Sequence, residues 1–150
     1  MAGRPSWDEY FIEVAKTVST RATCRRRSVG AVIERDRRIL ATGYNGAPRG
    51  VPHCEEYGCD ITQRCQLAAH AEQNAIAQAA ANGVSCSGAS IYVTCQPCSG
   101  CAKLLINAGI RRVVFEGDYP DDLALELFAL AGVDLYRFSC GKVELINATR

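Results

Sequence analysis

The sequence predicts an α/β protein in which a mixed β-sheet of about five strands carries helices on its faces. Three observations lead to this fold class: an amphipathic first helix, two strands joined by a short polar turn, and an alternation of helices and strands beyond them. The chain has 150 residues, the length of one domain, and shows neither linker nor repeat, so residues 1–150 are treated as a single domain.

The first part of the chain predicts one helix and a hairpin. Residues 7–20 carry apolar side chains at helical spacing, with Ser6 in the position of an N-cap. Residues 28–34 and 38–44 have the composition of strands, and the polar stretch 34–37 between them predicts a turn.

The rest of the chain predicts alternating helices and strands. Residues 45–50 are rich in Gly, Pro and Asn and predict a loop, whereas residues 51–67 show no clear periodicity. The expected elements beyond them are a helix over 70–81, a strand over 89–94, a helix over 98–108, a strand over 111–115, a helix over 121–131 and a strand over 133–138. The tail after Cys140 gives no readable pattern.

Composition restricts the classes of partner. The chain has 48% hydrophobic and 22% charged residues and a formal net charge of +1, which gives no electrostatic argument for a nucleic-acid partner. It contains no long apolar run, and its polar start differs from a secretion signal, so we expect a cytoplasmic protein with no membrane partner. In that compartment, nine cysteines favour metal binding over disulfides.

Two short strings carry the chemistry. His70-Ala71-Glu72 opens one predicted helix, and Pro97-Cys98-Ser99-Gly100-Cys101 opens the next. Cysteines at i and i+3 share one face of a first helical turn, so His70, Cys98 and Cys101 supply one imidazole and two thiolates. This donor set is typical of a catalytic zinc that keeps a fourth position for water.

Glu72 is a nearby carboxylate that is not part of this donor set. Its expected role is to take a proton from the zinc-bound water and to pass it to the substrate ring and then to the leaving ammonia. Cys95 also has metal-ligand spacing to Cys98. We assign Cys95 outside the ligand set because proline directly precedes the first cysteine in the H-x-E…P-C-x-x-C signature of zinc nucleobase deaminases. The alternative is a closed, non-catalytic zinc site with Cys95 as fourth ligand, which leaves Glu72 without a role.

Beyond these motifs, the chain resembles the bacterial-type deoxycytidylate (dCMP) deaminases of the cytidine deaminase-like superfamily, over residues 7–138. The strings that carry the resemblance are Cys24-Arg25-Arg26-Arg27-Ser28-Val29-Gly30-Ala31-Val32-Ile33, Gly43-Tyr44-Asn45-Gly46-Ala47-Pro48-Arg49-Gly50, Pro52-His53-Cys54, His70-Ala71-Glu72-Gln73-Asn74-Ala75-Ile76, Pro97-Cys98, Cys101-Ala102-Lys103 and Ile106-Asn107-Ala108-Gly109-Ile110. The resemblance implies a three-layer αβα cytidine deaminase-like fold and the hydrolytic conversion of dCMP to dUMP, the precursor of thymidylate.

The resemblance also implies roles in substrate binding. It implies that Asn45 holds the deoxyribose and that the Ala71 backbone N–H helps to hold the base carbonyl. It further implies that a basic residue near Arg26 meets the 5′-phosphate and that Tyr119 covers the base. The residues alone leave alternatives open: Asn45 as a turn residue, Arg26 as part of a solvated basic cluster, and Tyr119 as a surface aromatic.

Assembly and regulation follow from the same resemblance. Family members often form homohexamers that dCTP activates and dTTP inhibits, so a homo-oligomer and these effectors are implied. The chain departs from bacterial members at Leu67-Ala68, where they carry Arg-Thr, and this departure bears on phosphate and effector contacts.

A second, structural zinc is expected from four further cysteines, Cys24, Cys54, Cys59 and Cys65. It would hold the segment 51–67, which has few apolar residues of its own. His53 is the variant ligand in place of one thiolate. The alternative is a set of ordinary thiols, which is also the expected state of Cys86, Cys95 and Cys140.

Three functions are therefore compared. The first is dCMP deamination. The second is another zinc deaminase, acting on a different cytosine nucleotide or nucleoside, on guanine, or on a polynucleotide base. The third is a non-catalytic zinc-binding module. The near-zero net charge disfavours a polynucleotide, and the presence of Glu72 disfavours the third function.

Overall fold

The computed structural model describes residues 3–24, 26–54, 66–118 and 120–147. Its helices are α1 (Trp7–Ser19), α3 (Ala71–Ala81), α4 (Ser99–Asn107) and α5 (Asp122–Ala131). Its strands are β1 (Gly30–Arg35), β2 (Arg38–Tyr44), β3 (Ser90–Val93), β4 (Arg112–Phe115), β5 (Asp134–Ser139) and β6 (Lys142–Leu145). The predicted elements begin and end within two residues of these bounds.

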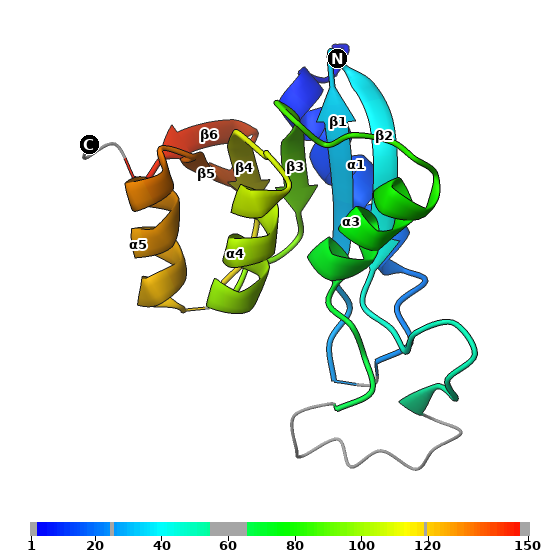
Figure 1. Cartoon of the computed structure of the whole chain (residues 1–150). Helices are drawn as coiled ribbons and strands as arrows, with labels where there is room; N and C mark the ends of the chain where they lie inside the picture. Colours follow the sequence, from blue (N-terminus) through cyan, green and yellow to red (C-terminus); the bar gives the residue numbers. More distant parts are fainter. Residues whose placement is uncertain (1–2, 25, 55–65, 119, 148–150) are drawn as a thin grey trace.

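The strands form one mixed sheet in the order β2-β1-β3-β4-β5-β6. β1 runs antiparallel to both β2 and β3. The strands β3, β4 and β5 are parallel to one another, and β6 runs antiparallel to β5. α1 covers one face of the sheet, while α3, α4 and α5 cover the other (Figure 1). The predicted fold class, a three-layer α/β arrangement with helices on both faces, is confirmed.

The sheet has six strands among the described residues, one more than the sequence predicts. The additional strand, β6, follows a tight turn in which Cys140 and Gly141 have φ values of 51° and 76°. It lies at the sheet edge, and its four residues are mostly exposed, so it lacks the apolar alternation that reveals a strand. The predicted 34–37 turn is also shorter than expected: only Asp36 and Arg37 leave the strands, both with positive φ.

Two hydrophobic layers hold the helices to the sheet. Successive strand residues point to opposite faces, so Tyr92 packs with Phe11 and Ile12 of α1, while Ile91 and Val93 pack on the other side. All five side chains are at most 2% exposed. The larger layer lies between the sheet and the helices α3, α4 and α5, which therefore have fixed positions relative to the strand ends.

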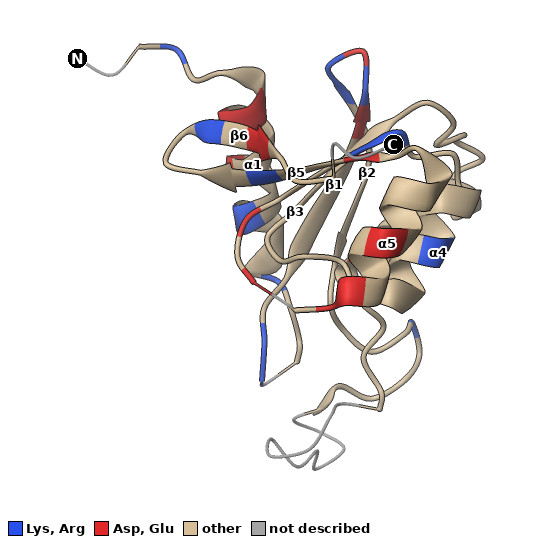
Figure 2. Cartoon of the chain, turned by 90° about the vertical axis from the view of Figure 1, so that its left-hand side faces the viewer, with Lys and Arg blue, Asp and Glu red and all other residues tan. Residues whose placement is uncertain are grey.

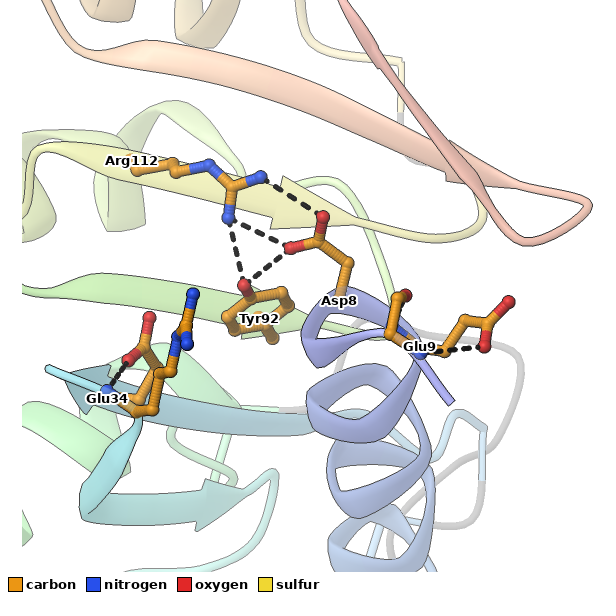
Figure 3. A network of polar contacts seen from close by, with 7 residues as sticks. Asp8, Glu9, Glu34, Tyr92 and Arg112 are labelled. Carbon is orange, nitrogen blue, oxygen red and sulfur yellow. Dashed lines mark hydrogen bonds and ion pairs between the residues drawn. The ribbon is translucent and has the colours of Figure 1, made fainter. Parts of the chain in front are cut away.

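A polar network ties the start of α1 to the sheet (Figure 3). The Tyr92 hydroxyl donates to Asp8 Oδ1 at 2.6 Å, and Arg112 Nη1 lies 3.0 Å from the same oxygen and 2.8 Å from the Tyr92 hydroxyl. Burial by itself raises the pKa of Asp8, but the hydrogen bonds from Arg112 and Tyr92 outweigh it, and the net pKa is lowered. Burial and the bond to Asp8 raise the pKa of Tyr92.

Figure 2 shows Lys and Arg interspersed with Asp and Glu over the loops, strand ends and helices on this side of the molecule. In the part of the chain that the structure describes, no helix combines the length and the apolar character needed to cross a membrane.

Candidate active site and metal centre

The three helices on one face of the sheet all begin at the same edge, the lower one in Figure 1. His70 is the residue directly before α3, and Cys98 is the residue directly before α4, both with extended backbone. Cys101 lies in the first turn of α4. Because the N-terminus of a helix carries partial positive charge, this placement favours thiolate over thiol.

The structure brings the three predicted metal ligands together. His70 Nδ1 lies 3.2 Å from Cys101 Sγ and 3.5 Å from Cys98 Sγ, and all three ligand atoms lie within 4.8 Å of one another. A tetrahedral zinc with usual bond lengths separates a nitrogen and a sulfur ligand by about 3.5 Å. The residues therefore fit a single zinc ion, and they are the only cluster of this kind among the described His, Cys, Asp and Glu residues.

The two cysteines differ in their readiness to ionise. Hydrogen bonds from Cys101 and His70 lower the pKa of Cys98 to about 4. The bond to Cys98 and burial raise the pKa of Cys101. One thiolate is thus stabilised by the protein itself, which suits a site that binds a cation.

Glu72 lies in the first turn of α3, beside this cluster, and is only 5% exposed. Burial is the main cause that raises the pKa of its carboxyl group above the usual range. A carboxyl group whose pKa is raised keeps a proton more readily than an exposed one, which suits general acid–base catalysis.

A cavity of about 430 Å³ opens over these residues, a size typical of small-molecule sites. Its walls include His70, Glu72 and Cys98 together with three of the four predicted substrate contacts, Asn45, Ala71 and Arg26. Ala71 occupies the first helical position of α3, where a backbone N–H has no acceptor within the helix. The fourth predicted contact, Tyr119, lies outside the described residues.

Asn45 has a structural role besides its place in the cavity wall. Its Oδ1 accepts the Val29 N–H at 2.7 Å, and its Nδ2 donates to the Arg27 carbonyl at 2.7 Å. The side chain is 7% exposed and holds the 27–29 segment against the end of β2. This bonding is more than that of a plain turn residue, and it fixes the backbone next to Arg26.

Cys95 lies in the cavity wall, outside the ligand cluster. Its thiol donates to the carbonyl groups of Gln96 and Asp118 at 3.6 and 3.7 Å, and burial raises its pKa to about 11. Arg27 Nη2 donates to the same Asp118 carbonyl at 2.9 Å. The loop after β4 is therefore attached to the cavity wall from two sides.

The predicted second zinc site falls partly outside the described residues, which do not include Cys59 and Cys65. Cys54 is buried, Cys24 is half-buried and lines the cavity, and His53 is exposed.

Two residues of the site were not predicted from the sequence. The Gln73 side chain accepts the His70 N–H at 2.7 Å and so fixes the backbone of a metal ligand. The spacing from His70 to Gln73 matches that of a capping box, which is the signal that would have indicated it. The sequence predicts Asp121 as the first residue of a helix and gives it no role in the site. In the structure its carboxylate accepts the Ser99 N–H at 2.8 Å, a contact that no local pattern predicts.

Fold and donor set together place the chain among the zinc-dependent deaminases. Residues 5–117 match the family model described as the cytidine and deoxycytidylate deaminase zinc-binding region. The chain belongs to this family, and the predicted resemblance and enzyme class are confirmed.

Similarity to individual proteins supports the same assignment. The chain is 47% identical over 132 residues to ComE operon protein 2 of Bacillus subtilis, covering 87% of this chain and 70% of that protein. It is 38% identical over 148 residues to the deoxycytidylate deaminase of Schizosaccharomyces pombe, covering 90% of this chain but only 45% of that relative. The crystal structure of the dCMP deaminase from cyanophage S-TIM5 in complex with dCMP and dUMP superposes with a TM-score of 0.80 at 29% identity, covering 91% of this chain and all of that chain.

Proposed function

We propose that this chain catalyses the hydrolytic deamination of dCMP to dUMP. In this proposal His70, Cys98 and Cys101 hold a catalytic zinc, and Glu72 transfers protons. The observation that carries it is the position of a buried carboxyl group beside a three-ligand cluster in the wall of one cavity. The similarity to deoxycytidylate deaminases, one of them in complex with dCMP and dUMP, supports dCMP as the substrate.

The chemistry divides between the ion and the protein. Zinc in an open three-ligand site lowers the pKa of a bound water to about 7 and so supplies the nucleophile for hydrolysis. Glu72 would accept a proton from the attacking water, whose oxygen bonds to C4 of cytosine, and deliver it to the ring nitrogen next to C4. It would then carry the proton of the new C4 hydroxyl group to the amino group, so that the C4–N bond breaks, ammonia leaves and the oxygen stays on C4 as a carbonyl.

The cavity wall offers one group for each part of the nucleotide. The Ala71 N–H, at the first position of α3, suits the base carbonyl, and Asn45 suits the sugar hydroxyl. Arg26 is exposed at the cavity, and its guanidinium group suits the phosphate. Tyr119 as a cover for the base stays a prediction.

Ammonia release from dCMP, dCTP, deoxycytidine, cytidine and guanine, each with and without added dCTP, tests this proposal. We expect dCMP to have the highest kcat/KM, and Arg26→Ala to raise the KM for dCMP more than that for deoxycytidine, because only the former has a phosphate. A chain that prefers guanine, or that releases no ammonia from any cytosine compound, would contradict the proposed substrate.

A second zinc bound by Cys24, Cys54, Cys59 and Cys65, with His53 as the variant ligand, is part of the proposal. The burial of Cys54 supports it, because a thiol at an ordinary surface loop would be exposed. Elemental analysis of the purified chain is expected to give two zinc ions per subunit. Cys54→Ser should lower the melting temperature more than the exposed control Cys140→Ser. One zinc in fully active protein would exclude the second site.

The remaining expectations concern assembly and surroundings. A homo-oligomer such as a hexamer, regulation by dCTP and dTTP, a cytoplasmic location and the absence of nucleic-acid or membrane partners stay predictions. Light scattering with and without dCTP measures the size of the oligomer, and ammonia release from dCMP with and without dCTP or dTTP measures the regulation.

A further inference from the structure

The N-terminus of α4 lacks the usual form of capping. N-cap residues are most often Ser, Thr, Asp or Asn, because their side chains accept one of the backbone N–H groups of the first turn. Here the N-cap residue is Cys98, whose side chain makes no capping hydrogen bond and whose sulfur lies with His70 and Cys101. The N–H of Ser99, at the first position of α4, has no acceptor within the helix and needs one from another part of the chain.

Asp121 supplies that acceptor from a different part of the chain. Its Oδ2 accepts the Ser99 N–H at 2.8 Å, and its Oδ1 accepts the Ala124 N–H at 3.1 Å, which caps α5. Gln96 Nε2 donates to the Asp121 carbonyl at 3.3 Å, so the residues on both sides of the Pro97-Cys98 pair are attached to Asp121. One carboxylate therefore joins the N-termini of two neighbouring helices.

The bond from Ser99 matters to Asp121 electrostatically as well. It is the largest cause that lowers the pKa of the Asp121 carboxyl group. An ionised acceptor forms a shorter and stronger bond with a backbone N–H than a neutral one. The residue that donates this N–H, Ser99, is the direct neighbour of the metal ligand Cys98.

We propose that Asp121 is a positioning residue for the catalytic metal site: by binding the Ser99 N–H, it fixes the first turn of α4 and with it Cys98 and Cys101. The proposal rests on the zinc site of the proposed function. Both sulfurs belong to this one turn, so a rotation or shift of the turn moves them together relative to His70 on α3. Metal–ligand distances in proteins lie within about 0.2 Å of their usual values, and loss of an outer hydrogen bond typically costs 10–100-fold in metal affinity or activity.

Ser99→Pro is the decisive substitution. Proline is favoured at the first position of a helix, and it removes both the N–H and the hydroxyl through which Ser99 bonds to Asp121. Cys98, which would precede it, has φ −75° and ψ 171°, an extended conformation that a following proline allows. Ser99→Ala is the matched control, because it removes the hydroxyl, which also bonds to Asp121, but keeps the N–H. The proline Cδ takes the place of the N–H hydrogen, so in Ser99→Pro the Asp121 carboxylate has to move, whereas in Ser99→Ala its bond to the Ala124 N–H, which caps α5, is intact.

Asp121→Ala and its neighbour control Asp122→Ala form a second pair. Each removes one negative charge from the start of α5, but only the first removes the acceptor of Ser99. If Asp121→Ala does not fold, the comparison of Ser99→Pro with Ser99→Ala still decides the question.

The main measurement is the rate at which zinc passes to a coloured chelator in the absence of substrate. The catalytic ion is identified as the zinc that the wild-type chain contains and the Cys98→Ser variant lacks. We expect Ser99→Pro and Asp121→Ala, which both disturb the contact between Asp121 and the first turn of α4, to release this ion about tenfold faster than Ser99→Ala and Asp122→Ala. Cobalt-substituted Ser99→Pro should also show a shifted thiolate charge-transfer band.

Equal release rates and equal cobalt spectra for Ser99→Pro and Ser99→Ala would overturn the positioning role. That result is distinct from a failure of the proposed function, in which the unmodified chain holds zinc at Cys98 but releases no ammonia from cytosine compounds.

Discussion

Gly43 of β2 is the point at which the sheet meets the helix that carries His70 and Glu72. A methyl group at this position would lie 3.0 Å from the α-carbon of Ala75, and closer still to the Ala71 carbonyl oxygen and the Ala75 nitrogen. All three atoms belong to the backbone of α3, so no side chain can rotate away. Gly43→Ala is therefore expected to displace the helix.

The magnitude follows from these distances. Ordinary van der Waals separation begins at 3.4 Å, so moving the Ala75 α-carbon clear of the methyl group requires 0.4 Å, and the two closer atoms raise the required displacement to on the order of 1 Å. Overpacking of this kind costs about 1–3 kcal/mol of unfolding free energy, and 2 kcal/mol corresponds to a fall in Tm of about 4–8 °C for a domain of this size. A misplacement of about 1 Å at Glu72 is expected to lower kcat/KM by about 100-fold.

The assay combines thermal unfolding, zinc content and dCMP deamination on the same preparation. Gly100→Ala is the control, since it makes the same chemical change in α4, where the added methyl group would lie 3.9 Å from Cys98 Sγ. Alanine in a helix is more stable than glycine by up to about 1 kcal/mol, so the control should keep or raise the Tm. Wild-type Tm and wild-type kcat/KM in Gly43→Ala would refute the argument that this close packing positions the site.

Three further predictions follow from the site and from the α1 network. Glu72→Gln should keep its zinc but lose about 10²–10⁴-fold in kcat, and a zinc-loaded variant with a near-normal rate would exclude the proton-transfer role. Cys98→Ser should lose catalytic zinc while Cys95→Ser keeps both metal and activity; the reverse pattern in metal analysis would mean that the ligands are wrongly assigned. Asp8→Asn should cost about 1 kcal/mol at neutral pH. The folded-state pKa of Asp8 is lowered, so the difference in unfolding free energy between the wild type and Asp8→Asn should be complete above the unfolded pKa of 3.8. It should vanish as the pH falls through the lower folded-state pKa. Chemical denaturation across pH measures this difference, and a pH-independent difference would contradict the ionic role.

The sequence was informative wherever a local period or spacing decides the structure. The helices α1, α3 and α5 and the central strands carry apolar side chains at the spacing of their element, and each was predicted to within two residues. β6 was not predicted because an exposed edge strand needs no alternation of apolar residues in its sequence. Its hydrogen bonds to β5, and not the burial of apolar side chains, hold it in the sheet.

In the candidate site too, local sequence spacing predicts some features, and others depend on tertiary contacts. The ligand triad could be predicted, because Cys98 and Cys101 share one helical turn and His70 stands at the start of another helix. The bonds of Asn45 to the 27–29 segment and of Asp121 to Ser99 could not, because they join loops that only the folded sheet brings together. The sequence indicates the candidate metal ligands and the candidate acid–base group, whereas the contacts that hold them in place depend on tertiary structure.

The topology explains why these loops meet. β3 and β4 are parallel, so the loops that follow them, which lead to Cys98 and to Asp121, leave the sheet at the same edge. β1 runs antiparallel to β3, and its first residue, Gly30, receives the Thr94 N–H on its carbonyl, so the segment before β1 reaches that edge as well. In open α/β sheets, ligands bind beyond the carboxyl ends of the parallel strands. Here the reversed direction of β1 brings Arg26 to that edge, and β2, which pairs Tyr44 with Gly30, ends there and adds Asn45. Both residues therefore join the wall of the cavity over the predicted metal site.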